Sequence, residues 1–378
     1  MRKKYLFVAL SDSQENYYHA LIAEGLILGE VVRIKFFKHG SFLKAYRWAK
    51  KNNICSRSWV EFKFQTLLVN NRAYGFNKIL KFFLQLDALR FADAFKNKLE
   101  NFKPDGVVIF NGAHYKHQAA ISVAKQAQKK IIFLELGCFP NTTMVDDEGV
   151  NAASSVSRNA EFYRGYQPKN DTQLPNALIT REDHPGRVSQ DESNDLPLRY
   201  IFVPFQVHDD TQVLINSPWV PTMQKFYEAL ETSLPYLDSD ISFVIKEHPS
   251  DKVTYPDLYS KNERILFANG NNTQALIENS CAVITLNSTV GIESLLLGKS
   301  VITLGNAFYN IEGVATHAFN QTSLNNTVQN LANLERDADL IKSFLFYLQE
   351  NYLIEGWSKN FDQKHLLKMS NRMISLIE

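Results

Sequence analysis

The stretch AVITLNSTVGIESLLLGKSVITLG, residues 282–305, decides the fold class. An apolar segment leads through the polar turn Asn287-Ser288-Thr289 into a helical pattern, and a second apolar segment rich in β-branched residues follows. This succession is typical of the βαβ unit of a parallel sheet. Ligands of such sheets bind beyond the carboxyl ends of the strands, so the residues that follow each strand are the first candidates for a site.

The same alternation extends over most of the chain. Strands are predicted at 5–10, 31–37, 104–112, 129–137, 199–205, 242–248 and 264–268. Helices are predicted at 11–26, 76–102 (as one helix or two), 113–128, 218–232, 273–280, 323–334, 337–350 and 362–377. For the first helix, Asp12 is the predicted N-cap, with Glu15 three residues on. The pattern predicts an α/β protein with two Rossmann-like domains facing across a cleft.

A stretch rich in Pro, Asn and Asp separates the two halves. We predict an N-terminal domain over 1–155, a linker over 156–198 and a second domain over 199–335. The C-terminal helices, 336–378, could cross back to the first domain.

Composition excludes several classes of protein. A net charge of +1 over 378 residues gives no sign of nucleic-acid binding. The 3 cysteines lie far apart without a CxxC pair, which argues against a disulfide scaffold or a cysteine zinc site and suits a reducing compartment. No run of about 18 apolar residues predicts a membrane span. These features favour a cytoplasmic protein.

One segment is unusually basic and aromatic. Residues 33–53, RIKFFKHGSFLKAYRWAKKNN, carry many Lys and Arg with Phe, Tyr and Trp, and no acidic residue. Such a mixture can rest on an anionic membrane surface, here the inner face of the inner membrane. A solvated helix whose aromatic residues pack inward is the ordinary alternative. The residues alone leave both interpretations open.

The turn after residue 286 has the chemistry of a phosphate site. Free N–H groups at the helix start, with the hydroxyls of Ser288 and Thr289, can hold an anion. Glu293 lies about one turn along the same face and could bind the hydroxyls of a ribose. Ser288 as a plain N-cap and Glu293 as an ordinary helix-start residue are the alternatives. No GxGxxG or GxxxxGK[ST] motif occurs, so a conventional dinucleotide or ATP site is unsupported.

The sequence KEHP, residues 246–249, ends another predicted strand. In extended geometry Lys246 and His248 share a side, and Glu247 points the other way as an outward neighbour. A cation beside an imidazole suits a phosphate that gains charge as it leaves, and Pro249 fixes the strand exit. A polar turn with a satisfied histidine is the alternative.

Carboxylates follow strands in both halves. Asp209 and Asp210 follow the strand at 199–205, and Glu135 ends the strand at 129–137. One aspartate can cap a helix while the other acts as base or nucleophile, and a pair across a cleft suits transfer at an anomeric carbon. His114 and His117 lie i, i+3 without a third metal ligand at a recognised spacing, and no GxSxG elbow supports a serine hydrolase.

Four segments together resemble the bacterial capsule polysaccharide biosynthesis and export-associated family, which includes β-Kdo transferases; related modules act in some O-antigen systems. The matching segments are ELGCFPNTTMVDDEGVN (135–151), FQVHDDTQVLINSP (205–218), KEHP (246–249) and NSTVGIESLLLGKSVITLGNAFY (287–309). The second segment selects Asp210 over Asp209. The likeness spans roughly Asn111 to Tyr309, and residues 1–100 carry no motif of the family.

The resemblance implies a GT-B-like architecture and a CMP-Kdo donor, with no cofactor and no required metal. It implies transfer of Kdo to a glycan or glycolipid acceptor with retention of the β configuration, by double displacement. Asp210 is then the nucleophile, Glu135 the acid/base, and His248 the partner of the leaving phosphate. The implied donor-binding residues are Gln206, Lys246, His248, Pro249, Asn287, Ser288, Thr289, Glu293 and Tyr309. The implied acceptor-side or structural residues are Asn111, Gly112, Gly137, Asp146 and Asn151.

Other functions fit the same residues. A sialyl-type transferase would use another CMP-activated 2-keto sugar acid on the same fold. A non-catalytic polysaccharide export or binding component would bind CMP without turnover. An epimerase of similar fold would use UDP and act on the donor itself. The sequence does not identify the acceptor or the linkage position.

Overall fold

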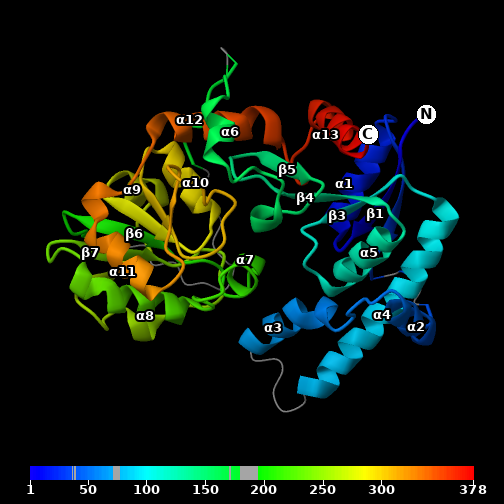
Figure 1. The fold of residues 1–378 in the computed structure, drawn as a ribbon, viewed down its shortest axis with the longest axis horizontal. Helices are drawn as coiled ribbons and strands as arrows, with labels where there is room; N and C mark the ends of the chain where they lie inside the picture. The colour runs from blue at the N-terminus through cyan, green and yellow to red at the C-terminus, as the bar shows by residue number, and fades with distance from the viewer. Residues whose placement is uncertain (36, 38–39, 71–76, 170–171, 179–194) are drawn as a thin grey trace. The chain divides into compact units, whose positions relative to one another are not determined.

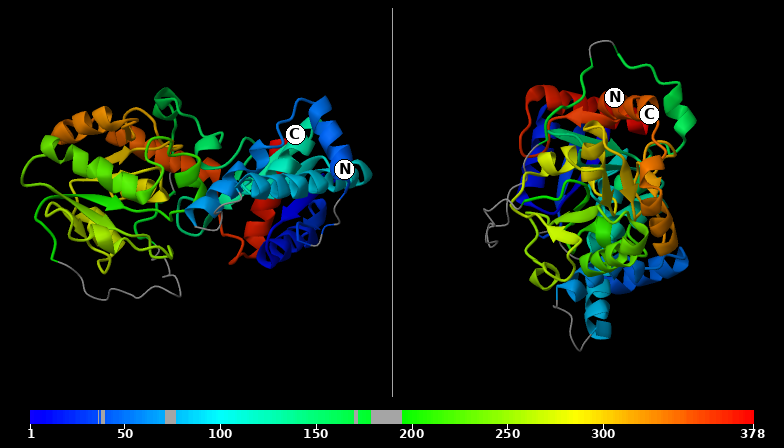
Figure 2. Two further views of the ribbon diagram at one scale, coloured as in Figure 1. Left: turned by 90° about the horizontal axis from the view of Figure 1, so that it is seen from below. Right: turned by 90° about the vertical axis from the view of Figure 1, so that its left-hand side faces the viewer.

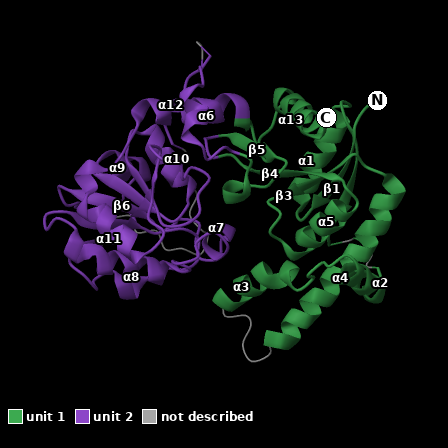
Figure 3. Cartoon of the chain, viewed as in Figure 1, with its two compact units in different colours: residues 1–137, 141–155, 352–378 green, residues 138–140, 156–351 purple. Residues whose placement is uncertain are grey.

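The computed structural model describes residues 1–35, 37, 40–70, 77–169, 172–178 and 195–378. The chain forms two compact units (Figure 3). The first unit consists of Met1–Gly137, Asn141–Ser155 and Tyr352–Glu378, and the second of Cys138–Pro140 and Val156–Asn351. Both are α/β units, as predicted, and each is built on a six-stranded sheet.

The sheet of the first unit has the order β12-β5-β4-β3-β1-β2. Its strands are β1 (Lys4–Ala9), β2 (Leu28–Arg33), β3 (Gly106–Phe110), β4 (Lys130–Leu136), β5 (Thr142–Asp146) and β12 (Leu353–Glu355). The first four strands are parallel, whereas β5 and β12 pair antiparallel at one edge.

Helices cover both faces of this sheet. They are α1 (Asp12–Ala23), α2 (Phe42–Lys51), α3 (Glu61–Val69), α4 (Asn77–Phe102), α5 (Tyr115–Gln126) and α13 (Gln363–Ile377). Along β1, Leu6 and Val8 enter a core shared with α2, α4 and α5, whereas Tyr5 and Phe7 enter a core shared with α1 and α13 (Figure 1). A strand buried on both faces needs a continuous apolar run, and this explains the sequence YLFVA.

The sheet of the second unit is parallel throughout, in the order β11-β10-β9-β6-β7-β8. Its strands are β6 (Tyr200–Pro204), β7 (Ser242–Lys246), β8 (Ile265–Phe267), β9 (Ala282–Thr285), β10 (Val301–Thr303) and β11 (Thr316–His317). Its helices are α6 (Ala160–Arg164), α7 (Thr211–Leu214), α8 (Met223–Ser233), α9 (Thr273–Glu278), α10 (Thr289–Leu296), α11 (Gln321–Gln329) and α12 (Ala338–Tyr347). Helices α8 and α11 pack side by side on one face, and α9 and α10 contribute to the core on the other (Figure 2).

Several element predictions need correction. Strands β5 and β12 were not predicted: β12 has three residues, and both form against antiparallel partners rather than in the βα alternation. Helix α8 begins at Met223, not at residue 218, because Pro221 precedes its N-cap, Thr222. The N-cap of α1 is Ser11, whose hydroxyl accepts a hydrogen bond from the Gln14 N–H at 3.3 Å, and Asp12 is the first helical residue.

The predicted boundaries also differ from the observed division. The predicted linker belongs to the second unit where it is described, and the rings of Tyr163 on α6 and Phe344 on α12 lie 5.1 Å apart; residues 170–171 and 179–194 lie outside the described part. The C-terminal helices do not all belong to one unit. Helix α12 stays with the second unit, whereas β12 pairs with β5 and α13 packs on α1 in the first. The cleft between the halves stays a prediction.

Candidate functional site

The carboxyl edge of the second sheet gathers most of the predicted site residues. The chain builds outward from β6 in both directions, to β7 and β8 on one side and to β9 and β10 on the other. The loops after β6 and β9 therefore lie at the switch point where doubly wound sheets bind ligands. Hydrogen bonds join the ends of four neighbouring strands: Gln206 with Asn287, His208 with Asp251, and Tyr309 with Ser288.

Gln206 and Asn287 brace this edge from inside. The Gln206 side-chain amide donates to Asn287 Oδ1 at 3.1 Å, and the Asn287 N–H donates to Gln206 Oε1 at 3.3 Å. Asn287 Nδ2 donates to the carbonyl oxygens of Gln212 and Asn216. Both side chains are buried. The structure thus gives two predicted donor-binding residues a role in fixing the loops, and direct contact with a donor stays a prediction.

Asp210 caps a helix and keeps one carboxylate oxygen available. Its Oδ1 accepts hydrogen bonds from the Gln212 N–H and the Thr211 hydroxyl, both at 3.0 Å. Among the described residues, the structure records no hydrogen bond to Oδ2. The N-cap role and the nucleophile role are therefore compatible, because the cap occupies Oδ1 only and holds the carboxylate in one orientation.

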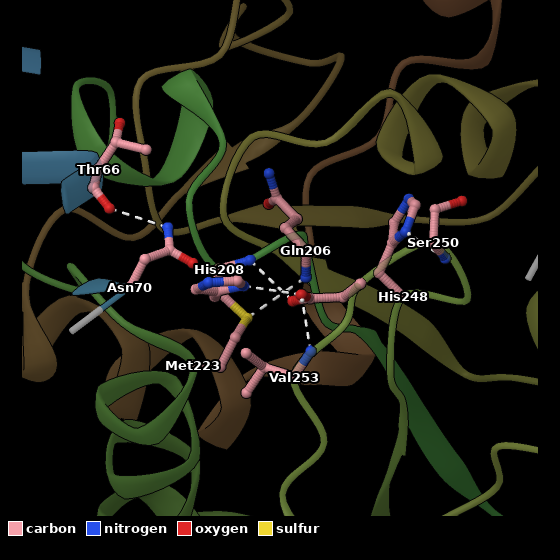
Figure 4. A network of polar contacts seen from close by, with 9 residues as sticks. Thr66, Asn70, Gln206, His208, Met223, His248, Ser250 and Val253 are labelled. Atoms are coloured by element: carbon pink, nitrogen blue, oxygen red, sulfur yellow. Dashed lines mark hydrogen bonds and ion pairs between the residues drawn. The ribbon is translucent and has the colours of Figure 1, made fainter. Parts of the chain in front are cut away.

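A histidine–aspartate pair that the sequence did not predict lies next to Asp210. Asp251 is 2% exposed and accepts hydrogen bonds from His208 Nδ1 at 2.7 Å and from the His208 backbone N–H at 2.8 Å. The Val253 N–H donates to the same carboxylate at 3.1 Å (Figure 4). The available signal was that His208 and Asp251 each follow a predicted strand, but nothing in their spacing pairs them.

Lys246 and Glu247 of the KEHP segment both form hydrogen bonds with other loops of the same unit. Lys246 Nζ donates to the carbonyl oxygens of Asn269 and Asn271, the latter at 2.7 Å. Glu247 is buried and accepts hydrogen bonds from the Tyr255 N–H at 2.7 Å and the Tyr259 hydroxyl at 3.0 Å. Glu247 was predicted to face outward. That prediction was wrong, because its buried carboxylate holds the next loop inside the unit.

His248 and Pro249 form the turn that leads to Asp251. The Asp251 N–H donates to the His248 carbonyl at 3.0 Å, and the Ser250 N–H donates to His248 Nδ1 at 3.2 Å (Figure 4). Because Nδ1 accepts, the neutral ring carries its proton on Nε2. The half-buried His248 thus lies on the loop that also supplies Asp251.

The start of α10 has the predicted cap, and Tyr309 contacts it from the loop after β10. The Ser288 hydroxyl accepts a hydrogen bond from the Val290 N–H at 3.2 Å, with Thr289 and Glu293 half-buried on the first turns. Tyr309 is fully buried and donates to the Ser288 carbonyl at 2.5 Å, and burial raises its pKa. A Cβ on Gly291 would lie 2.3 Å from the Tyr309 hydroxyl. Tyr309 therefore supports the start of α10, and its direct contact with a donor stays a prediction.

In the first unit, Asn111 orients Glu135. Asn111 Nδ2 donates to Glu135 Oε2 at 2.5 Å, and the Leu136 N–H donates to Oε1 at 2.9 Å. Asn111 and Gly112 both have positive φ, 63° and 92°, which turns the chain sharply after β3. The predicted carboxylate thus lies at the carboxyl edge of its own parallel strands, held by a residue that was predicted with it.

The remaining predicted residues of the first unit are structural. Asp146 is fully buried, and its carboxylate accepts from the N–H groups of Glu148, Gly149 and Ser155 and from two hydroxyls, those of Ser155 and Tyr352. A Cβ on Gly137 would lie 1.9 Å from Thr142 Oγ1, so only glycine fits. Asn151 begins a short 3-10 turn at a φ of 53°. These residues were predicted to bind the acceptor or to have a structural role, and their contacts favour the structural role.

His114 and His117 in the first unit lie where burial disfavours the charged ring. Burial and the neighbouring Lys116 lower the pKa of His114 to about 4, and burial lowers the pKa of His117 to about 3. His114 accepts from the Lys116 N–H as the cap of α5, and His117 lies inside the unit. Over the described ranges, no three His, Cys, Asp or Glu side chains gather as metal ligands.

The chain is similar to several known proteins, two of which are named for capsule polysaccharide. The family profile described as "Capsule polysaccharide biosynthesis protein" matches residues 180–357. Protein FixF of Sinorhizobium fredii (strain NBRC 101917 / NGR234) is 38% identical over 292 residues, which cover 76% of this chain and 69% of FixF. Capsule polysaccharide export protein KpsS of Escherichia coli is 25% identical over 307 residues, covering 65% of this chain and 76% of KpsS. A structure titled "Thermosulfurimonas dismutans KpsC, beta Kdo 2,7 transferase" covers 100% of both chains at 14% identity, with a TM-score of 0.45.

Proposed function

The chain belongs to the capsule polysaccharide biosynthesis family, and on that premise we propose that it is a glycosyltransferase that moves Kdo from CMP-Kdo to a glycan or glycolipid. One observation carries the proposal. The loops after β6, β7 and β9 meet at the switch point of a parallel sheet and bring together a helix start, two histidines and a carboxylate with an available oxygen. A CMP-activated sugar acid requires a site for a phosphate and a group that attacks the anomeric carbon.

Each residue then has a defined task. The start of α10, with Ser288 and Thr289, binds the phosphate of the donor through N–H groups and hydroxyls, and Glu293 binds the ribose. His248 donates to the leaving phosphate. Asp210 Oδ2 attacks the anomeric carbon, and the acceptor hydroxyl then displaces it, so the β configuration is retained. Glu135, oriented by Asn111, takes the proton of the acceptor. No step in this scheme calls for a metal.

Two alternatives remain worth testing against this proposal. A transferase of another CMP-activated 2-keto sugar acid would use the same phosphate and nucleophile groups, because these donors differ in the sugar. A polysaccharide export component would bind without turnover, and the names of the relatives, export protein KpsS among them, allow it. An ordered carboxylate with one oxygen outside the cap favours the enzyme over the binding component.

We expect the protein to release CMP from CMP-Kdo in the presence of an accepted glycan or glycolipid and to form a β-Kdo product. Freshly made CMP-Kdo, CMP-sialic acid and a UDP-sugar are incubated in parallel with an acceptor panel, and products are analysed by mass and by anomeric configuration. Turnover of CMP-sialic acid but not of CMP-Kdo would identify the protein as a sialyl-type transferase instead. CMP binding without turnover of any donor, across lipid and glycan acceptors, would support the export component instead.

Helix α2 supports a peripheral contact with an anionic membrane surface. Among the helices that the structure describes, none has the length and apolar character needed to span a bilayer. On α2, Ala45 and Ala49 face the core, whereas Phe42, Leu43 and Tyr46 are 41%, 52% and 51% exposed. The inward-packing alternative holds for Phe37 and Trp48, which pack against the core, but not for Phe42 and Tyr46. Residues 36, 38 and 39 of the predicted basic segment lie outside the described part.

Charge reversal on this helix should reduce lipid binding. Lys44, Arg47 and Lys50 are exposed beside the apolar side chains, and α2 contains no acidic residue. Each basic residue near an anionic surface contributes about 1 kcal/mol, so K44E/R47E/K50E should weaken binding by on the order of 10²-fold. Cosedimentation with vesicles containing anionic lipid, at low and high salt, measures the change.

A matched variant separates this effect from net charge. The changes K125E/K130E/K225E alter charge equally at exposed positions outside α2 and should leave lipid binding nearly unchanged. Equal losses in both variants would show that net charge, not α2, determines the interaction, and unchanged binding of the α2 variant would contradict the contact.

A further inference from the structure

His114 lies at the carboxyl edge of the first unit's sheet, at the point where the winding of the chain reverses. The chain places β2 on one side of β1, and β3 followed by β4 on the other side. Ligands of doubly wound sheets bind beyond the strand ends at such a switch point. His114 follows β3 by four residues and is the N-cap of α5. It therefore lies in the loop where a ligand of the first unit is expected.

The same loop orients the proposed acid/base, Glu135. Asn111 Nδ2 donates to Glu135 Oε2 at 2.5 Å, and the Ala113 N–H donates to Asn111 Oδ1 at 3.1 Å. One side chain therefore joins the carboxylate near the end of β4 to the residue that precedes His114. Glu135 and His114 thus belong to one hydrogen-bonded turn of a single unit.

The His114 ring is held by the protein and presents a neutral donor. Its Nδ1 accepts a hydrogen bond from the Lys116 N–H at 3.3 Å, so the neutral ring carries its proton on Nε2. Burial and the neighbouring Lys116 lower the pKa of His114 to about 4, so the ring is neutral at pH 7. The half-buried ring lies against His117, with ring centroids 5.8 Å apart. Nε2 has no hydrogen-bond partner among the described residues, and the protein does not enclose it, so this N–H can reach a ligand.

A neutral N–H donor near a carboxylate suits a sugar hydroxyl better than an anion. A hydroxyl both donates and accepts hydrogen bonds, so a sugar can use the two groups at once. A phosphate offers acceptor oxygens and negative charge, which the Glu135 carboxylate repels. The chemistry of this turn therefore fits the acceptor rather than the phosphate of the donor.

We propose that His114 is an acceptor-binding residue that donates from Nε2 to an oxygen of the acceptor sugar; the inference rests on the proposed function. Glu135 takes the proton of the attacking hydroxyl, and the oxygen of that hydroxyl forms the new bond to the anomeric carbon as the bond to Asp210 breaks. The electron pair of the broken bond returns to the Asp210 carboxylate. His114 keeps its proton throughout and positions the sugar.

A purely structural role as the cap of α5 is the competing explanation. His114→Asn separates the two roles, because asparagine is a good N-cap but has no group at the place of Nε2. His114→Ser, with another good N-cap residue, makes the same separation with a different side chain. A cap role predicts that both variants use the acceptor as wild type does, whereas acceptor binding predicts that both are impaired.

The experiment measures Kdo transfer at saturating CMP-Kdo over a range of concentrations of an acceptor that wild type uses. Thermal unfolding and the formation of the Kdo ester on Asp210 without acceptor are measured beside it. We expect both variants to unfold close to wild type and to form the ester at the wild-type rate. Their kcat/KM for the acceptor should fall about tenfold, as for loss of one hydrogen bond. A control is His19→Asn, which alters an exposed histidine 3.9 Å from Glu15 and should leave kcat/KM unchanged.

The outcomes separate this inference from the proposed function. A wild-type protein that transfers Kdo to no acceptor overturns both. Transfer by wild type with an unchanged kcat/KM in folded His114→Asn and His114→Ser overturns the inference alone and leaves His114 as a helix cap. An equal loss of ester formation in the two variants also overturns it, because the defect would then not lie in acceptor binding.

Discussion

Replacing Asp210 with asparagine should abolish glycosyl transfer and leave the fold intact. The Asp210 carboxylate caps α7 through Oδ1 alone, and asparagine caps helices as well as aspartate does. The amide cannot form the glycosyl ester that double displacement requires. Because the nucleophile carries the chemical step, we expect transfer to fall by on the order of 10³-fold or more. Product formation from CMP-Kdo, measured beside the thermal unfolding curve, tests this.

The neighbouring carboxylate provides the matched control. Asp209→Asn makes the same chemical change one residue earlier and should retain most of the activity. Asp210→Ala should lose both transfer and the cap, which is worth about 0.5–2 kcal/mol of stability. Near-normal transfer by a folded Asp210→Asn protein would contradict the assignment of Asp210 as nucleophile. Loss of transfer in Asp209→Asn alone would assign that role to Asp209.

The largest effect on stability is expected at Asp146, in the other unit. Its fully buried carboxylate accepts five hydrogen bonds, three from N–H groups and two from hydroxyls. Asp146→Ala leaves these donors without their acceptor, and breaking such a buried network costs about 3–5 kcal/mol. Urea unfolding should therefore show a lower midpoint for the first unit.

Asp147→Ala is the control for this change. Asp147 lies 3.9 Å from Lys130, whose side chain is 60% exposed, and such surface pairs contribute about 0–1 kcal/mol. Equal midpoints for Asp146→Ala and wild type would contradict the structural role that the contacts assign to Asp146 and would return it to the acceptor-binding candidates.

The alternation of strands and helices was predictable because strands buried on both faces need continuous apolar runs. The runs at β1, β3, β6 and β7 are of this kind. Strands β5 and β12 were not predictable in this way. Strand β12, at the edge of the sheet, has three residues and pairs with β5, some two hundred residues earlier in the chain. The choice of Ser11 over Asp12 as N-cap likewise depends on where the strand before it ends.

The location of the candidate site followed from topology, but the roles of its members did not. Parallel strands bring the residues after β6, β7 and β9 to one edge, so Asp210, His248 and Ser288 could be grouped from the sequence. Whether a polar residue contacts a ligand or only supports the loops of the site depends on its burial. The alternation of strands and helices does not predict that burial. Glu247 was wrongly predicted to face outward for this reason. His208 and Asp251 are 43 residues apart, and only the pairing of β6 with β7 brings them together.

The most direct test of the account is to look for the glycosyl ester itself. The protein is incubated with CMP-Kdo without acceptor, quenched, and examined by intact-mass spectrometry followed by peptide mapping. The account predicts an added Kdo residue on the peptide that contains Asp210, absent from Asp210→Asn, and its loss when acceptor is supplied. Active protein that forms no adduct and yields a product of inverted configuration would contradict it.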